Sequence, residues 1–328
     1  MTRAAVLPAL RAGAYGRHPL HAEDRVWVER NCYADVFVEL LHALGLEPRA
    51  MLGHTAAIDF TGDGFTFFKP SHDELRDLYG MDVQELNVWR TPLEHALEHL
   101  GAGRFIATEA DAFWLPDTAG TDYRQQPVKT TIVLNAVDVD ARRAGYFHNA
   151  GYFELEGEDF DRTFAADARP LPLYAELVRI DRLVRRPADA LRHLARERLA
   201  VHAARAPREN PVRRWGARFA LDLPELQARG LPHYHRWAFS TTRQVGAAME
   251  LLAAHLEWLA EDAADAPLRE AAAAFARVST GAKAFILKAA RAVHHGRPLD
   301  AAPLFDEMAA AWDDGMARLP GGARAVPA

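Results

Sequence analysis

The spacing of apolar residues changes along the chain and predicts two differently built halves. Between Asn31 and Gly45 apolar residues recur every three to four positions, which predicts an amphipathic helix. Asn31 is a good N-cap and Gly45 a good stop, so Cys32 is expected in the first helical turn. Two capping boxes that begin at Ser71 and Thr91 predict two further helices.

Strand patterns follow in the first half of the chain. The stretches 104–109, 129–137, 145–148 and 152–156 are rich in aliphatic and aromatic residues, and short polar connections join the last three. Such connections indicate an antiparallel meander. Residues 57–68 read as two short strands around a Gly-Asp-Gly turn, which predicts a hairpin.

After about residue 168 the strand pattern disappears and prolines separate helical stretches. Three long amphipathic segments lie near 236–260, 267–296 and 299–318. The second half is therefore expected to be a helical bundle or cap. We predict an α+β class, with a papain-like domain over 1–168 and an all-helical domain over 169–328.

Length, charge and cysteine content narrow the class of protein. A chain of 328 residues exceeds the usual size of one core and fits two domains. A net charge of -6 argues against nucleic acid or anionic membrane as a partner. No apolar run is long enough for a membrane span, and a single cysteine cannot form an internal disulfide, so we expect a cytoplasmic protein.

Cys32 is the strongest candidate for chemistry. The positive end of a helix stabilises a thiolate, and thiol enzymes of the papain type place their nucleophile at such a helix start. They pair it with a histidine on a later strand and an Asn or Asp that orients the ring. His148 and Asn149 at a strand end fit these roles. The alternative is that Cys32 is a small apolar residue and His148 a hydrogen-bonded core residue.

The turn-rich loop 115–127 connects two of the predicted strands and is expected to be exposed. Acids in and around it could bind an amine substrate near the thiol, and Lys129 opens the strand that follows. The candidate substrate-binding residues are Asn31, Asp111, Asp117, Tyr123 and Lys129.

A second motif, His95-x-x-Glu98-His99, matches the pattern of inverted zinc peptidases and places two imidazoles on one helix face. A solvated helix face is the simpler interpretation, because no third ligand is evident and such matches arise easily in a chain with 15 histidines. We therefore assign no metal and no cofactor. The motifs of serine hydrolases, P-loop proteins and dinucleotide-binding proteins are missing from the sequence.

Several stretches resemble an uncharacterised bacterial domain-of-unknown-function family that is associated with stand-alone amino acid:[carrier protein] ligases. The resemblance is densest between Asn31 and Asp159. It implies an aminoacyl or acyl carrier protein as the partner. The stretches that carry it are Asn31-Cys-Tyr-Ala-Asp, Phe67-Phe-Lys-Pro, Leu78-Tyr-Gly-Met-Asp-Val-Gln-Glu-Leu-Asn-Val-Trp, Leu115-Pro-Asp-Thr-Ala-Gly-Thr-Asp-Tyr-Arg, Lys129-Thr-Thr-Ile and Gly145-Tyr-Phe-His-Asn-Ala-Gly-Tyr.

The helix that opens with Asn31-Cys32, followed by Glu109-Ala-Asp-Ala-Phe-Trp-Leu-Pro and a meander, is more remotely similar to the N-terminal domain of the butirosin acyltransferase. That similarity implies a papain-like thiol site that moves an acyl group from a phosphopantetheine thioester to an amine. Such enzymes carry a histidine where this chain has Pro127-Val-Lys129. The base is then His148 or Lys129, or the site binds without turnover.

We therefore expect a thiol-dependent acyl or aminoacyl transferase that acts from a carrier-protein thioester onto a small amine or hydroxyl acceptor. One alternative is a protein that binds aminoacyl-carrier protein without catalysis. The other is a zinc-dependent hydrolase that uses His95, Glu98 and His99.

Overall fold

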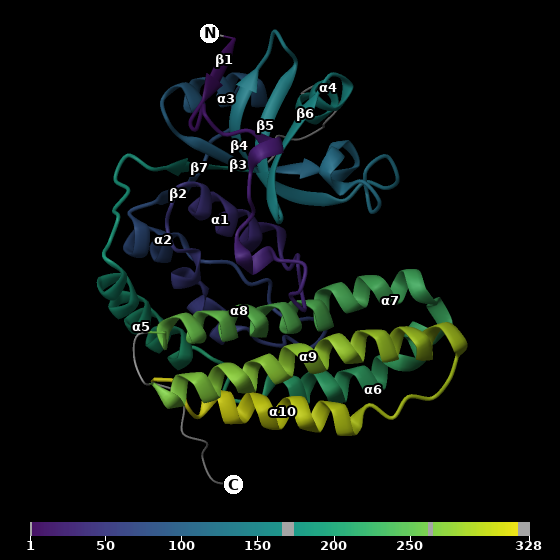
Figure 1. Cartoon of the computed structure of the whole chain (residues 1–328). Helices are drawn as coiled ribbons and strands as arrows, with labels where there is room; N and C mark the ends of the chain where they lie inside the picture. Colours follow the sequence, from purple (N-terminus) through teal and green to yellow (C-terminus); the bar gives the residue numbers. More distant parts are fainter. Residues whose placement is uncertain (1, 166–173, 262–264, 321–328) are drawn as a thin grey trace. The chain divides into compact units, whose positions relative to one another are not determined.

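The computed structural model describes residues 2–165, 174–261 and 265–320 (Figure 1). The chain folds into two compact units, which we name the sheet unit and the helical unit. The sheet unit consists of residues 1–23, 32–48 and 71–186. The helical unit consists of residues 24–31, 49–70 and 187–328.

The sheet unit is built on a seven-stranded sheet whose pairings are all antiparallel. Its strand order is β2-β7-β3-β4-β5-β6, and the short β1 pairs with the far end of β4. The strands are β1 (Arg3–Ala5), β2 (Asp82–Glu85), β3 (Phe105–Asp111), β4 (Lys129–Asp138), β5 (Arg143–His148), β6 (Gly151–Glu156) and β7 (Ala175–Arg179).

Helices cover both faces of this sheet. On one face, α1 (Cys32–Ala43) packs on β4 and β5. On the other face, α3 (Pro92–Gly101) packs on β1, β3 and β4, and its Ala96 and Leu100 join a core with Ile132. Among the described residues of the unit, the other α-helices are α2 (His72–Tyr79) and α4 (Glu158–Phe164).

The sequence pattern predicted most of these elements correctly. The helix after Asn31 begins at Cys32, and the capping boxes at Ser71 and Thr91 start α2 and α3. At Thr91 the box is complete, because the Thr91 side chain accepts the backbone N–H of Glu94 and the Glu94 carboxylate accepts that of Thr91. The meander β4-β5-β6 and the α+β class are also confirmed.

Three short strands escaped prediction. β1, β2 and β7 have three to five residues each, and each is held by partners far away in the sequence. β7 continues the sheet beyond residue 168, and the expected boundary between residues 168 and 169 lies outside the described residues. The predicted hairpin over 57–68 is reduced to one antiparallel bridge between Phe60 and Phe65.

The helical unit contains several long helices that run alongside one another in Figure 1. α9 packs on both α8 and α10, and α6 packs on α10. The helices are α5 (Ala188–Ala204), α6 (Pro211–Arg229), α7 (Leu231–Ala238), α8 (Gln244–Leu259), α9 (Ala266–His295) and α10 (Ala302–Met316). Among the described residues, none of the helices combines the length and the apolar character that crossing a bilayer requires.

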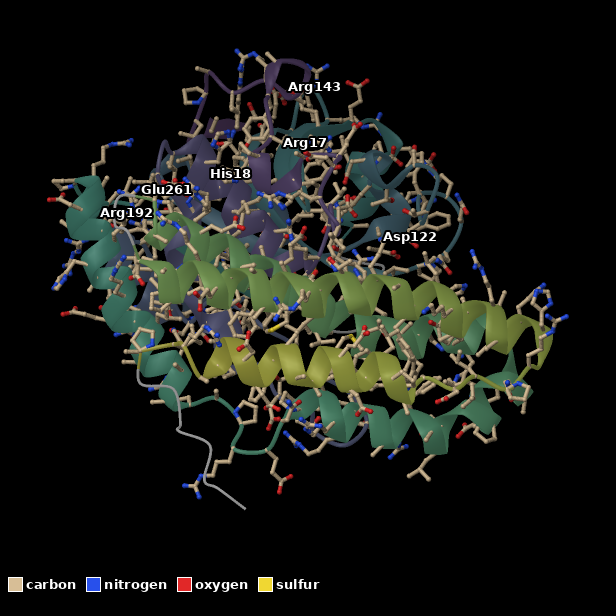
Figure 2. The ribbon with its side chains drawn as sticks, turned by 60° about the horizontal axis from the view of Figure 1, so that its bottom comes forward. Arg17, His18, Asp122, Arg143, Arg192 and Glu261 are labelled. Carbon is tan, nitrogen blue, oxygen red and sulfur yellow. The ribbon has the colours of Figure 1, made fainter. Side chains whose placement is uncertain are left out.

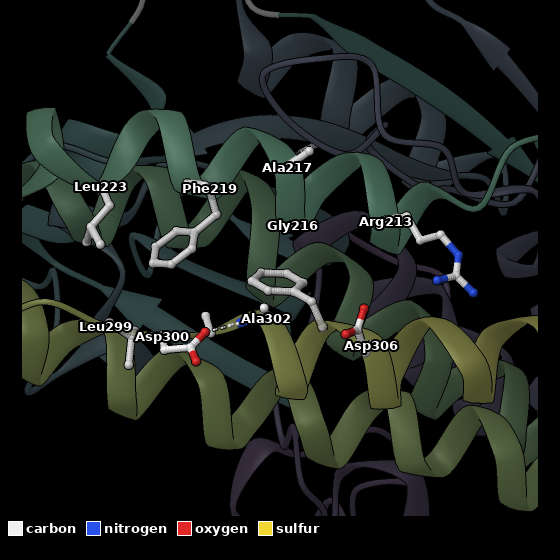
Figure 3. A pocket seen from close by; sticks show the side chains of 12 residues that line it. Arg213, Gly216, Ala217, Phe219, Leu223, Leu299, Asp300, Ala302 and Asp306 are labelled. Atoms are coloured by element: carbon white, nitrogen blue, oxygen red, sulfur yellow. Dashed lines mark hydrogen bonds between the residues drawn. The ribbon is translucent and has the colours of Figure 1, made fainter.

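Aromatic rings fill the centre of this unit. The buried Trp215 ring contacts the rings of Phe65, Phe285 and Phe305 edge to face. Phe305 also packs against Gly216, where a Cβ would lie 2.9 Å from the Phe305 ring. Beside these residues α6 and the start of α10 border a cavity of about 520 Å³ (Figure 3).

Two early segments of the chain are built into the helical unit. Arg30 is fully buried and its Nη2 lies 3.0 Å from the carboxylate of Glu250 on α8. The indole nitrogen of Trp27 donates to Ser279 on α9 at 3.1 Å.

Arg192 of α5 forms an ion pair with Glu261, which follows α8, at 2.8 Å (Figure 2).

Candidate functional site

Cys32 is the first residue of α1 and is half-buried. Its Sγ lies 3.7 Å from the hydroxyl of Thr131 on β4. Asn31, which precedes it, donates from its side-chain amide to the carbonyl of Phe68 at 2.8 Å. The sequence therefore placed the thiol correctly at a helix start, and a hydroxyl from the sheet lies beside it.

His148 lies on the opposite face of the sheet from Cys32. Its Nε2 is 2.7 Å from the hydroxyl of Thr130, whereas Cys32 contacts Thr131. Neighbouring residues of a strand point to opposite faces, so Thr130 and Thr131 separate the imidazole from the thiol. The structure does not bring Cys32 and His148 together as a nucleophile and its base.

His148 instead forms a hydrogen bond that connects the loop 115–127 to the sheet. Its Nδ1 lies 2.5 Å from Asp117, and the other oxygen of Asp117 accepts the hydroxyl of Tyr146 at 2.5 Å. Burial, followed by the nearby charge of Asp117, raises the pKa of Tyr146 well above its ordinary value. The expectation of an exposed loop is wrong for Leu115, Asp117 and Thr118, whose side chains are buried.

Three other predicted residues have local partners. Asn149 occupies the two-residue turn between β5 and β6 with a φ of +41°, a conformation that asparagine tolerates better than most residues. Asp111 accepts the backbone N–H groups of Phe113 and Val128. The Tyr123 hydroxyl donates to Asp159 at 2.9 Å. Asn149 thus shapes a turn, and Asp111 and Tyr123 hold the loop in place.

Lys129 does lie on the thiol's face of the sheet, because it precedes Thr131 by two residues on β4. Its ammonium group is 2.9 Å from Glu109, and Glu109 on β3 lies directly opposite Thr131. Directly opposed residues share a face of the sheet. Thr131, Glu109 and Lys129 therefore form a polar layer next to Cys32.

A second group of polar residues on this face was missed by sequence reasoning. Glu176 of β7 is fully buried and accepts the hydroxyls of Tyr33 and Tyr174 at 2.7 and 2.8 Å. The Nε2 of His72 lies 3.3 Å from the same carboxylate. His72 was visible inside a capping box, but Glu176 could not be placed while β7 was unrecognised.

Burial alone would raise the pKa of Glu176, but hydrogen bonds from His72, Tyr33 and Tyr174 outweigh it and hold that pKa below its ordinary value. Burial and then the charge of Glu176 raise the pKa of Tyr33 well above its ordinary value. The group therefore contains an ionised carboxylate beside two neutral phenols and an imidazole.

α1 carries a further buried network toward its middle. His21 is fully buried between two carboxylates of this helix, bonding Glu39 through Nδ1 and lying 3.2 Å from Asp35 through Nε2. Tyr15 donates its hydroxyl to Glu39 at 2.5 Å. Hydrogen bonds from His21 and Tyr15 overcome the effect of burial and lower the pKa of Glu39. No sequence pattern had singled out these residues.

The zinc motif lies on α3 without a metal-binding arrangement in the described parts of the chain. The Nε2 of His95 accepts the backbone N–H groups of Trp89 and Arg90 at 3.1 and 3.2 Å. The rings of His95 and His99 stack 6.1 Å apart. In residues 2–165, 174–261 and 265–320, no group of three or more His, Cys, Asp or Glu residues could hold a metal ion.

Comparison with protein families assigns both parts of the chain. The family model described as the DUF1839 N-terminal domain matches residues 16–180, and the one described as the DUF1839 C-terminal domain matches residues 188–320. No curated protein is similar enough to the chain to indicate a relationship. Because the two matches together span most of the sequence, the chain belongs to the DUF1839 family.

Proposed function

We propose that the chain is a thiol-dependent acyltransferase. Cys32 would take an acyl or aminoacyl group from the phosphopantetheine thioester of a carrier protein and pass it to an amine or hydroxyl acceptor. The observation that carries the proposal is the position of the half-buried thiol at the start of α1, next to the polar layer of Thr131, Glu109 and Lys129. The partial positive charge at the start of a helix stabilises negative charge on a nearby thiolate or oxyanion.

The chemistry divides into two balanced steps. In the first, the sulfur of Cys32 attacks the thioester carbon, the bond from that carbon to the pantetheine sulfur breaks, and the pantetheine thiol leaves with the proton that Cys32 lost. In the second, the acceptor nitrogen or oxygen attacks the new thioester, the bond to Cys32 breaks, and the acceptor's proton returns to the Cys32 thiol. No oxidant, reductant or metal takes part in either step.

The proton of the acceptor would pass through His72 and Glu176 rather than through His148. Glu176 on β7 lies two strands away from β4 and in register with Val133, two residues from Thr131, so its Cα lies about 12 Å from that of Thr131 at the usual strand spacing and rise. Such an offset suits a base that deprotonates an acceptor lying between it and the acyl group, and does not suit direct contact with the sulfur. The short contact to Glu176 would hold the His72 ring in place during this transfer.

A second candidate is a protein that binds aminoacyl-carrier protein without turnover. The observation that favours it is the neighbour of the thiol, which is the hydroxyl of Thr131 rather than an imidazole. A hydroxyl cannot remove the thiol proton at neutral pH. Binding without reaction would leave Cys32 as a contact residue.

The first experiment traps the acyl-enzyme. The protein is incubated with a carrier protein whose phosphopantetheine bears an alanyl group, and intact-protein mass spectrometry measures the mass added to the chain. We expect a stoichiometric adduct on the wild type, none on Cys32→Ala, and an unchanged adduct on the exposed-surface control His193→Ala. His72→Gln should still form the adduct but release it to an added amine about 10² to 10⁴ times more slowly.

An equal adduct on Cys32→Ala would refute the nucleophile. A wild type that forms no adduct but binds the loaded carrier protein as tightly as Cys32→Ser does would favour the non-catalytic candidate. Release that is unaffected by His72→Gln would remove His72 from the proton path and leave the nucleophile standing.

A further inference from the structure

Two stretches of the helical unit contain basic residues and no acid. Residues 226–249 and 271–299 together include eight Lys and Arg side chains but neither Asp nor Glu. Because the whole chain has a net charge of -6, the remainder of the sequence carries a net charge of -14. The two stretches contain α7, the π-helical segment Phe239–Arg243 and most of α9, so positive charge is concentrated in those elements.

These elements lie side by side within the helical unit (Figure 1). The hydroxyl of Tyr234 on α7 donates to the carbonyl of Ile286 on α9 at 2.7 Å. Further along, a Cβ on Gly246 of α8 would come within 3.0 Å of Ala282. Residue numbers rise on one side of this contact as they fall on the other, so α9 runs antiparallel to α7 and α8.

The segment around Trp27 shows that exposed residues of both elements face the same side. The Trp27 ring lies 4.6 Å from the ammonium group of Lys283 on α9. Two residues after Trp27, the backbone carbonyl of Glu29 accepts a hydrogen bond from Arg243 at 2.9 Å. The Arg243 guanidinium in turn lies 5.5 Å from the ring of Phe239. Lys283, Arg243 and Phe239 are therefore neighbours on one side of the unit.

The second half of α9 continues this surface. Lys283, Leu287 and Arg291 follow one another at intervals of four residues and so share one side of the helix. Two large apolar side chains are exposed among the cations, since Leu287 is 54 % exposed and Phe239 is 52 % exposed. We name this exposed surface the basic face, and it consists of Arg236, Phe239, Lys283, Leu287, Lys288 and Arg291.

The cations on the α9 side of the basic face are not neutralised by acids of the chain. Among the described residues, no ion pair reaches Lys283, Lys288 or Arg291. Earlier on the same helix Arg277 pairs with Asp314 at 3.3 Å, so the uncompensated charge belongs to the second half of α9. The basic face can therefore take up negative charge from another molecule.

Two kinds of anionic partner fit the basic face less well than a protein does. A helix that lies in a lipid surface presents a continuous apolar side to the acyl chains, but the apolar side of α9 is buried in the bundle, with Phe285 and Ala289 among its members. A nucleic acid duplex extends well beyond a face of this size. The net charge of -14 in the rest of the chain would repel it there.

We propose that the basic face binds an acidic amphipathic helix of a partner protein. From Lys283 to His295 α9 extends for about 18 Å, which matches about three turns of a helix. Leu287 and Phe239 contact the apolar side of the bound helix, and its carboxylates pair with the cations around them. Opposite charges steer the two proteins together and set their orientation. The site belongs to the helical unit and does not depend on the acyltransferase proposal.

Binding is tested by fluorescence anisotropy of the full chain with a fluorescein-labelled helical peptide, Glu-Glu-Leu-Ala-Glu-Leu-Leu-Glu-Glu-Leu-Ala-Glu-Leu-Leu-Glu-Glu amide. We expect saturable binding with a Kd below about 100 μM at physiological salt, and weaker binding as salt is added. A counterpart with Gln in place of every Glu keeps the apolar side and loses the charge, so it should bind at least about tenfold more weakly.

Variants at exposed positions separate the basic face from general charge. Arg291→Glu should weaken the acidic peptide at least about fivefold, because it replaces attraction by repulsion. Leu287→Ser should weaken it about threefold or more through lost apolar contact. Arg208→Glu, which reverses an exposed charge between α5 and α6, is the matched control and should leave the Kd unchanged.

Several outcomes would overturn the proposal. They are a lack of saturable binding, equal binding of the Gln counterpart, and equal weakening by Arg208→Glu and Arg291→Glu. A duplex DNA and phosphatidylserine vesicles are added as competitors, and tighter binding of either one than of the peptide would assign the basic face to another class of partner.

Discussion

The position of single residues along β4 determines which side chains of the sheet lie near Cys32. Thr130 and Thr131 are neighbours on β4, yet one contacts His148 and the other contacts Cys32. A difference of one position in strand register would have placed the imidazole on the thiol's face. The sequence predicted the strand and both candidate residues, but it could not fix the face, because residues on both sides of this central strand are buried.

His18 provides a test at this scale. Its ring is buried, accepts the N–H of Leu20 through Nδ1 and packs edge to face on the ring of His42. Burial lowers the pKa of His18 to about 4, despite the opposing charges of Glu47 and Glu39, and the neighbouring rings of His42 and His21 lower it further. The folded protein thus holds this side chain neutral where an unfolded chain would already bind a proton.

The free energy of unfolding should therefore fall as the pH drops from about 6.5 toward 4. Over that range the unfolded state binds more protons at position 18 than the folded state does. His18→Asn keeps an acceptor for Leu20 and should remove as much as about 3 kcal/mol of this pH dependence. Urea unfolding at several pH values measures it. His193→Asn, at an exposed position, serves as the control, and an unchanged pH slope in His18→Asn would contradict the expectation.

At the scale of elements, local signals located the helices and the meander, whereas long-range pairing located the remaining strands. α1, α2 and α3 begin where caps and periodicity placed them, since these signals lie within a few residues of the helix start. β7 has five residues and no hairpin partner, so nothing local distinguishes it from a loop. Missing β7 also hid Glu176, and with it the polar group around His72.

Close packing of helices gives an element-scale prediction. Gly246 of α8 lies against the indole of Trp27, and a Cβ there would come within 2.6 Å of the ring and 3.0 Å of Ala282. Alanine is a better helix former than glycine by about 1 kcal/mol, but the clash with a buried ring should outweigh this gain. Gly246→Ala should lower the free energy of unfolding by about 1 to 3 kcal/mol.

Denaturant unfolding of the full chain measures the effect of Gly246→Ala. Gly281→Ala on α9 is the comparison variant, because its new methyl group would lie equally close, 2.6 Å from the Cγ of buried Met308, but would meet an unbranched side chain that can change rotamer instead of a ring. It should lose less stability than Gly246→Ala. A Gly246→Ala variant as stable as Gly281→Ala would mean that the Trp27 ring can move aside.

At the scale of the whole molecule, the two family domains do not coincide with the two compact units. The C-terminal family match begins at residue 188, but the helical unit also contains residues 24–31 and 49–70. These early segments supply buried contacts to α8 and the aromatic core. They are the pairing of Arg30 with Glu250 and the packing of Phe65 on Trp215.

Residues 187–328 expressed alone should therefore fail to form a stable unit. Without the early segments Glu250 loses its buried partner and the ring of Trp215 loses one of its neighbours, two changes that each destabilise a core. Circular dichroism should show reduced helix content and no cooperative thermal transition. Adding a peptide that spans residues 24–70 should restore part of the transition. Cooperative melting of the isolated segment at the temperature of the full chain would contradict this view.

The helical unit combines two early segments of the chain with helices that are synthesised last, and this has a consequence for protein synthesis. Residues 24–31 and 49–70 leave the ribosome long before α8 and α9 exist, on the order of ten seconds earlier at usual elongation rates. During that interval Trp27 and Phe65 have no partner helices to cover them. The nascent chain thus carries exposed aromatic side chains until translation is nearly complete, which makes it a natural client for a holding chaperone.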